Sequence, residues 1–152
     1  DLESTLHAMQ DKIDMLKKSA STKQSRIKEV NELLRMVDYY KSGKPAADKL
    51  KSIRFEKSRQ KYKSEHDNEL RTFYMAERKL KPYFKDGKLP ITAWRRERAQ
   101  LEQEYKDIQT ELSPLHADAK KLWAIHYNIY EVQHEQERQN VATRQKKQEI
   151  EH

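Results

Sequence analysis

A long run of apolar residues, spaced alternately four and three apart, constrains this chain more than any other feature of its sequence. The run places apolar side chains at positions 2, 6, 9, 13, 16, 20, 27, 30, 34 and 37. It misses one step, at Lys23, and otherwise keeps heptad spacing. The pattern predicts a straight helix of about 40 residues, on the order of 60 Å long, whose apolar seam needs a partner helix.

The sequence predicts that this first helix ends near Lys41. Gly43 can adopt the left-handed conformation that ends many helices, and Pro45 follows it. We expect a short helix over 46–53 and a second long helix over 58–83. A reversal that contains proline and glycine comes next.

A third helix is expected from Thr92 to the end of the chain, with heptad-like spacing from Trp94 onward. Pro114 lies inside this pattern and removes a helical hydrogen bond at a cost of about 3 kcal/mol, so we expect a kink there. After Gln133 the sequence becomes polar, and its last turns are expected to fray.

Two heptad helices that flank a helical turnaround predict an all-α fold, an antiparallel coiled-coil stalk with a small helical bundle at one end. The expected parts are a first coiled-coil helix (1–41), a basic and aromatic turnaround (42–95) and a second long helix (96–152). This arrangement places Tyr105 level with Lys41 and Thr143 near Leu2. A plain three-helix bundle with 42–57 as a loop is the alternative.

Composition excludes several classes of protein. Hydrophobic residues make up 35% and charged residues 38% of the chain, which favours long solvated helices over a thick core. There is no cysteine for a disulfide or a thiolate metal site, and no apolar run suits a membrane span. We therefore expect a soluble, cytoplasmic protein without membrane insertion. The chain begins without Met inside a helical pattern, so we interpret it as part of a longer protein.

The positive charge is concentrated in one stretch, residues 41–63. This stretch holds nine Lys and Arg against two acidic residues, a balance of +7 that equals the net charge of the whole chain. Such a patch is typical of a surface for a polyanion, although a charge run is often only a solvated helix face. Phe55 and Tyr62 lie among the cations. The predicted nucleic-acid interface comprises Lys44, Lys49, Lys51, Arg54, Lys57, Arg59, Lys61 and Lys63, with Arg95 and Arg96 across the turnaround.

No catalytic residue, metal site or cofactor is predicted. His66 with Glu69 could form half of a carboxylate-bridged metal site, but no second Glu-x-x-His pair faces it. His134-Glu135 begins like a metalloprotease motif, but Arg138 stands where its second histidine would be. A tyrosine nucleophile needs a metal or a cation cluster to stabilise its leaving group, and no His-x-His or acidic cluster accompanies the eight Tyr residues. Aromatic packing is the preferred interpretation of these side chains.

Several short motifs follow one another in a fixed order between Leu33 and Tyr130. They are Tyr39-Tyr40, Lys44-Pro45, the run from Tyr62 to Leu70, the run from Ala76 to Lys81, Asp86-Gly87-Lys88-Leu89-Pro90, and Trp94. This series resembles the C-terminal region of relaxases, the mobilisation nucleases of conjugative plasmids and integrative elements in Gram-positive bacteria.

The resemblance implies a role in conjugation. Relaxases are metal-dependent endonucleases whose N-terminal domain uses a Tyr and a His-bound metal to nick DNA at the origin of transfer. Those catalytic residues have no match in this sequence, so the resemblance implies a helical, non-catalytic segment that binds DNA or proteins of the transfer complex and secretion channel. The alternative is a coiled-coil interaction module, which could form a homodimer through its heptad seams without binding nucleic acid.

Overall fold

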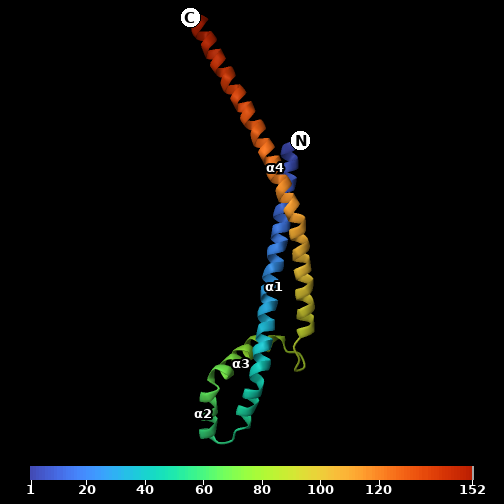
Figure 1. Cartoon of the computed structure of the whole chain (residues 1–152), viewed down its shortest axis with the longest axis vertical. Helices are drawn as coiled ribbons and strands as arrows, with labels where there is room; N and C mark the ends of the chain where they lie inside the picture. Colours follow the sequence, from blue (N-terminus) through green and yellow to red (C-terminus); the bar gives the residue numbers. More distant parts are fainter. Residues whose placement is uncertain (152) are drawn as a thin grey trace. The chain divides into compact units, whose positions relative to one another are not determined.

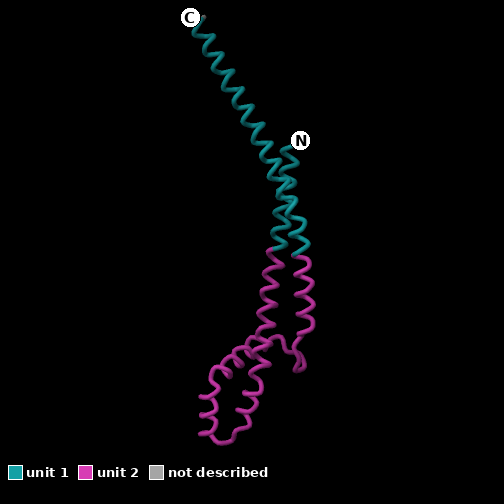
Figure 2. Tube along the Cα trace, in the orientation of Figure 1, with its two compact units in different colours: residues 1–20, 106–152 teal, residues 21–105 magenta. Residues whose placement is uncertain are grey.

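The structure is a computed structural model, and it describes residues 1–151 of the chain. The described residues form α1 (Leu2–Ser52), α2 (Glu56–Glu65), α3 (Asp67–Leu80), the 3-10 turn η1 (Lys81–Tyr83) and α4 (Ile91–Glu151), with no β-strand among them (Figure 1). The predicted all-α class is confirmed. The chain divides into two compact units (Figure 2): unit 1 contains Asp1–Ala20 and Lys106 onward, and unit 2 contains Ser21–Tyr105.

The first helix continues past the stop predicted near Lys41, because α1 includes both Gly43 and Pro45. A Cβ atom at Gly43 would lie 2.5 Å from the Cβ of Phe73 and 3.3 Å from the carbonyl oxygen of Glu69. Glycine is therefore needed for the close approach of α3 to α1 and not for a left-handed helix end. The predicted end at Lys41, and the separate short helix after it, are wrong.

The first of two core clusters in unit 2 lies where the C-terminal part of α1 packs against α3. Its buried members are Ala46, Ala47 and Leu50 of α1 and Leu70 and Phe73 of α3, and the partly buried Tyr40, Tyr62 and Tyr74 pack on it. The rings of Tyr40 and Phe73 stack with their centroids 5.0 Å apart. Pro45 costs α1 about 3 kcal/mol, and burial of the apolar residues that follow it offsets this loss at ~25 cal/mol per Å².

A second core cluster joins three helices of unit 2. α1 contributes Val30, Leu33, Leu34, Met36 and Val37, α3 contributes Ala76 and Leu80, and α4 contributes Trp94. The apolar residues of α3 recur three and four positions apart, which places them on one helix face. α3 therefore returns along α1 and delivers the chain to the level of Trp94, where α4 begins.

The single helix predicted over 58–83 is wrong, because the chain forms two helices there, α2 and α3. His66 separates them with φ −117° and ψ 25°. Its N–H donates to the carbonyl of Tyr62 at 3.0 Å, and its own carbonyl accepts from the N–H of Leu70 at 2.9 Å. His66 thus ends one helix and begins the next without a glycine or proline, which explains why the sequence pattern did not predict the break.

Within unit 2, α1 and α4 run antiparallel. The Nζ of Lys23 lies 2.9 Å from Glu104, and Nη2 of Arg26 donates to Oε2 of Glu97 at 3.2 Å. Glu104 is thus beside Lys23, and the prediction that Tyr105 lies level with Lys41 is wrong. The register differs because α2 and α3 fold back along α1 and bring the start of α4 to an earlier level of α1.

Unit 1 is a second antiparallel pairing of the same two helices. α1 buries Leu6, Ile13 and Ala20, which are seven residues apart, and α4 buries Leu112 and Ala119 with the same spacing. Lys12 pairs with Glu111 at 3.2 Å. The helix is continuous through Pro114, and the kink expected there stays a prediction.

α4 continues well past the start of α1. Counting antiparallel from the Lys12–Glu111 pair places Leu2 level with about residue 121 of α4, so the prediction that Thr143 lies near Leu2 is wrong. Beyond that level several large apolar side chains are exposed; these are Trp123, Ile125, Tyr127, Ile129, Tyr130 and Val132. α4 runs on to Glu151, and the fraying of its last turns stays a prediction. No helix within residues 1–151 has both the length and the apolar character of a membrane span.

Candidate nucleic-acid interface

The basic tip, defined here as residues 49–63, is the helical hairpin between the end of α1 and the end of α2. α1 ends at Ser52 and α2 begins at Glu56, so only three residues make the connection. Arg59 donates from Nη1 to the carbonyl oxygens of Leu50 and Ile53, both at 3.2 Å. These bonds satisfy carbonyl groups that a helix end leaves free. Arg59 therefore holds the hairpin closed and is not free to bind a ligand.

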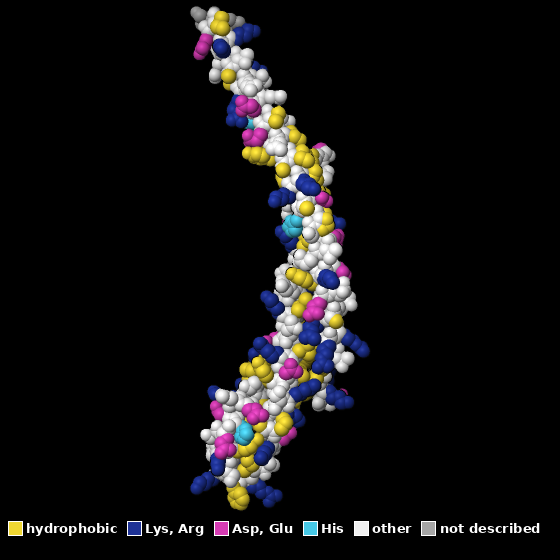
Figure 3. Space-filling view, in the orientation of Figure 1, with side chains coloured by type: hydrophobic (Ala, Val, Ile, Leu, Met, Phe, Trp, Pro, Cys, Tyr) yellow, Lys and Arg dark blue, Asp and Glu magenta, His cyan; other side chains and the backbone are white. Residues whose placement is uncertain are grey.

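Five cations of the basic tip are exposed and have neither an ion pair nor a cation–π contact within the described part of the chain. They are Lys51, Arg54, Lys57, Lys61 and Lys63. The tip as a whole carries seven basic residues against one acidic residue, Glu56, which lies 3.9 Å from Arg59. On the face shown in Figure 3, Lys and Arg side chains gather around this end of unit 2. The tip is thus a dense positive surface whose charge is not neutralised internally.

Two further predicted cations are partly engaged. Lys44 lies 3.7 Å from Asp48 and 5.8 Å from the centre of the Tyr40 ring. Lys49 lies 5.6 Å from the centre of the Tyr62 ring. Both contacts leave the ammonium groups at the surface, so these lysines can contribute to the field of the tip while being less available as direct ligands.

Aromatic side chains accompany the cations, as the sequence predicts, but they differ in exposure. Phe55 is 77% exposed in the loop between α1 and α2. Tyr62 is half-buried, and its ring centre lies 4.2 Å from that of His66. Phe55 therefore offers a ring face to a ligand, whereas Tyr62 mainly supports the fold.

Arg95 and Arg96 are not part of the tip. They follow Trp94, which is buried in the core cluster with Val37 of α1. From Val37 to the end of α1 at Ser52 is about 15 residues, or roughly 22 Å along the helix. The predicted set of ten residues therefore divides between two separate places on unit 2.

The sequence prediction identified only Arg95 and Arg96 of a second basic region, which we call the loop cluster (residues 78–98). It holds eight basic residues against two acidic ones. Some of this charge is paired, since Lys79 lies 3.8 Å from Glu32 and Arg98 donates to Asn31 at 3.3 Å. Six other cations have no ion pair among residues 1–151: Arg78, Lys81, Lys85, Lys88, Arg95 and Arg96. A charge count over shorter windows would have found it, because acidic residues elsewhere balance it in the total.

The ion pair of unit 2 with the clearest pKa shifts joins Arg26 of α1 to Glu97, at the C-terminal end of the loop cluster. The hydrogen bonds from Arg26 lower the pKa of the Glu97 carboxyl, and the same contact raises the pKa of Arg26 above its ordinary value. Gln100 and then Lys23 lower the pKa of Glu104 by hydrogen bonding. These carboxylates pair α4 with α1, so they neutralise cations of the helix pair and leave those of the tip unmatched.

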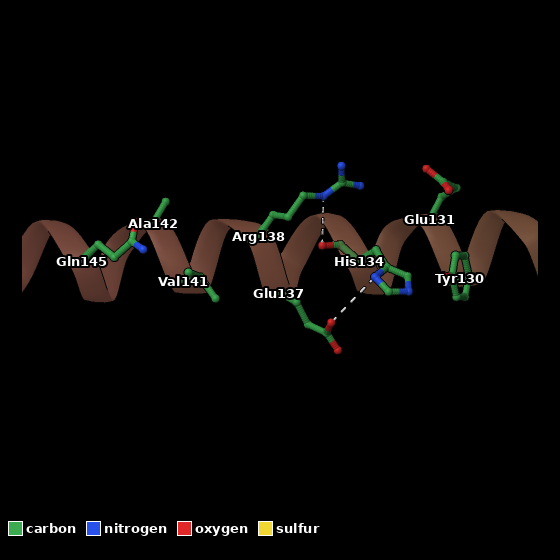
Figure 4. A pocket seen from close by; sticks show the side chains of 8 residues that line it. All are labelled: Tyr130, Glu131, His134, Glu137, Arg138, Val141, Ala142 and Gln145. Carbon is green, nitrogen blue, oxygen red and sulfur yellow. Dashed lines mark hydrogen bonds and ion pairs between the residues drawn. The ribbon is translucent and has the colours of Figure 1, made fainter.

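Residues 1–151 contain no cluster of potential metal ligands. Nδ1 of His66 lies 3.4 Å from Glu69, but no group of three or more potential metal ligands occurs there. A shallow hollow around Tyr130 and His134 lies on one face of α4 alone (Figure 4). In it His134 lies 3.8 Å from Glu137 and Arg138 donates to the His134 carbonyl at 3.4 Å. A single helix face encloses nothing, so the hollow suits no buried substrate.

Comparison with protein-family models, curated proteins and solved structures found no match.

Proposed function

We propose that the basic tip binds the phosphate backbone of DNA. The observation that carries this proposal is the set of five exposed cations, from Lys51 to Lys63, that lack an ion pair among the described residues. A compact hairpin holds them, because Arg59 closes the turn and the core cluster beneath it fixes α2 and α3. Cations on a fixed scaffold lose little conformational entropy on binding, which favours contact with a regular polyanion.

Binding of this kind is sensitive to salt and reads no sequence. Contacts to phosphates position a protein on nucleic acid, whereas base contacts specify a sequence. If four of the five cations meet phosphates of a duplex, the logarithm of affinity falls with the logarithm of salt at a slope of about −3.6.

We further propose that the chain is the non-catalytic helical part of a relaxase, with the tip holding DNA or the transfer complex during conjugation. The motif series supports this proposal, because the motifs from Tyr39 to Trp94 all lie in unit 2. They contribute Ala76, Leu80 and Trp94 to one core cluster and Leu70 to the other, and they include the break at His66 and the turn before α4. In this proposal, a nuclease domain outside residues 1–152 carries out the metal-dependent nicking of DNA.

The test is a titration of a labelled duplex against the chain at 50 and 200 mM salt. Replacing Lys51, Arg54 and Lys57 by Glu removes three contacts, which at 0.1 M salt corresponds to a loss of at least ~100-fold and a slope shallower by about 2.7. The matched control reverses Lys17, Lys120 and Lys121 of unit 1, which are also exposed. Equal losses in the two variants would show that binding depends on net charge alone and would refute the tip as an interface.

A second candidate function is a coiled-coil interaction module whose partner is a protein. The exposed apolar residues of α4 beyond residue 122 support it, since Ile125 is 48% and Ile129 is 47% exposed and no part of α1 extends to them in unit 1. Light scattering over a range of concentrations tests pairing with a second copy. A monomer mass throughout, for both the wild type and Ile129→Asp, would count against self-association.

A further inference from the structure

The turn before α4 holds two lysines directly opposite each other. The backbone N–H of Lys85 donates to the carbonyl of Lys88 at 2.9 Å, and the backbone N–H of Lys88 donates to the carbonyl of Lys85 at 3.0 Å. Between them, Asp86 has φ 52° and Gly87 has φ 73°. Two positive φ angles in a two-residue loop are the mark of a tight hairpin turn. Residues that exchange both hydrogen bonds place their side chains on the same face of the ribbon, with Cβ atoms about 5 Å apart.

This pairing is electrostatically unfavourable unless something negative lies near it. Like charges directly opposite each other destabilise a hairpin, and neither lysine has an ion pair with Asp86 or any other described residue. Lys81, Arg95 and Arg96 add to the positive field in the same loop cluster, again without ion pairs within residues 1–151. An anion that bridges the two ammonium groups would remove the repulsion.

An aromatic ring lies beside the lysine pair. Tyr83 is 40% exposed, and its ring meets that of the buried Trp94 edge-on, with the centroids 5.4 Å apart at 78°. This contact fixes the ring while leaving part of it open. Tyr83 and the lysine pair line one open hollow, whose residues are Pro82, Tyr83, Lys85, Lys88, Leu89 and Pro90. Two prolines and a hydrogen-bonded turn make the hollow rigid.

We propose that this hollow is a nucleotide-binding site for single-stranded nucleic acid. The phosphate lies between Lys85 and Lys88, and the base of the same or the next nucleotide packs on Tyr83. Lysine donates to phosphate oxygens as a point charge, and aromatic side chains stack on unpaired bases of any sequence. The inference rests on the proposed nucleic-acid function but concerns a different part of unit 2 from the basic tip.

The experiment measures binding of a labelled single-stranded oligonucleotide to the whole chain as a function of salt. Lys85→Ala with Lys88→Ala removes two phosphate contacts, so the slope becomes shallower by about 1.4 and affinity at 0.1 M salt falls about 25-fold. The control, Lys146→Ala with Lys147→Ala, changes the net charge equally on the exposed end of α4. An equal effect of the two double variants overturns the site.

The aromatic part of the site has its own test. Tyr83→Phe keeps the ring and is expected to bind normally, whereas Tyr83→Ala loses about fivefold or more on a single strand. An oligonucleotide affinity unchanged in a folded Tyr83→Ala variant, shown to be helical by circular dichroism, overturns the stacking role. One result would separate the two proposals. If reversing the charge of the basic tip leaves binding intact while the Lys85→Ala, Lys88→Ala double variant loses it, the binding site in the hollow is supported and the proposed function of the tip is refuted.

Discussion

Replacing Gly43 by Ala tests the close approach of α1 and α3, because two physical effects predict opposite results. In an exposed helix interior, alanine is more favourable than glycine by ~1 kcal/mol. At Gly43, however, the new Cβ atom would lie 2.5 Å from the Cβ of Phe73. Carbon atoms in contact are about 3.5–4.0 Å apart, so α3 must move by at least ~1 Å.

The steric effect should win. The Cβ of Phe73 is bonded to the backbone and cannot rotate away, and the stack of Phe73 on Tyr40 holds the ring in place. Overpacking of a core costs about 1–3 kcal/mol, from which the gain in helix propensity is subtracted. We expect Gly43→Ala to lower the free energy of unfolding by about 1–2 kcal/mol.

Urea denaturation followed by circular dichroism at 222 nm measures this difference. Ser42→Ala is the control, since Ser42 is exposed in the same turn of α1 and its replacement should change stability by less than about 0.5 kcal/mol. A Gly43→Ala variant more stable than the wild type by ~1 kcal/mol would show that propensity alone acts at this position, and the proposed contact with α3 would be refuted.

Three further predictions concern contacts within one unit or the other. Arg59→Ala should lower the free energy of unfolding by about 1 kcal/mol, because it frees the carbonyl groups at the end of α1; a thermal melt measures it. Glu97→Gln should cost roughly 0.5–1 kcal/mol at pH 7, an exposed-pair value, because it loses the pair with Arg26. The pKa of Glu97 is lowered in the folded state, so this stabilisation is complete above the unfolded pKa and is lost as pH falls through the folded value. Urea titrations at pH 7 and pH 2.5 should therefore show the two proteins converging in acid. Ile129→Ala should cost less than about 0.5 kcal/mol while Ile13→Ala costs ~2–5 kcal/mol, since Ile129 is 47% and Ile13 is 1% exposed; comparable losses would contradict the register of α1 and α4.

The heptad pattern predicted the helix class and much of the core. Leu6, Ile13, Val30 and Val37 all belong to the predicted seam, and all are buried. Heptad spacing is a reliable guide here because it reflects burial directly. The same pattern says nothing about register, however, since any antiparallel shift by a heptad keeps the seam matched.

Helix ends were harder to predict than helix faces. Gly43 and Pro45 are strong local stop signals, yet packing against α3 overrides both of them. His66 carries no local signal, yet the chain breaks there, and α3 leaves the break at an angle to α2 (Figure 1). At Gly43 the deciding interaction is with Phe73, which is distant in the sequence.

The candidate site was partly predictable. A charge count located the basic tip, because charge density depends on composition alone. It could not show that Arg59 is used for closing the turn, or that Arg95 and Arg96 lie apart from the other eight residues, since both facts depend on tertiary structure. The DNA interface itself stays a prediction.

The continuity of α1 past Gly43 and Pro45 gives unit 2 a fixed length scale. About 15 to 22 residues of uninterrupted helix separate the α1 residues that share a core cluster with Trp94, Val30 to Val37, from the end of α1 at Ser52, or roughly 22–33 Å. At 3.4 Å per base pair this spacing corresponds to about six to ten base pairs of a duplex. Adding or removing whole heptads in α1 and in the returning α2 and α3 would change that footprint in steps of about 10 Å. The length of these helices therefore sets the distance between the two basic regions of unit 2.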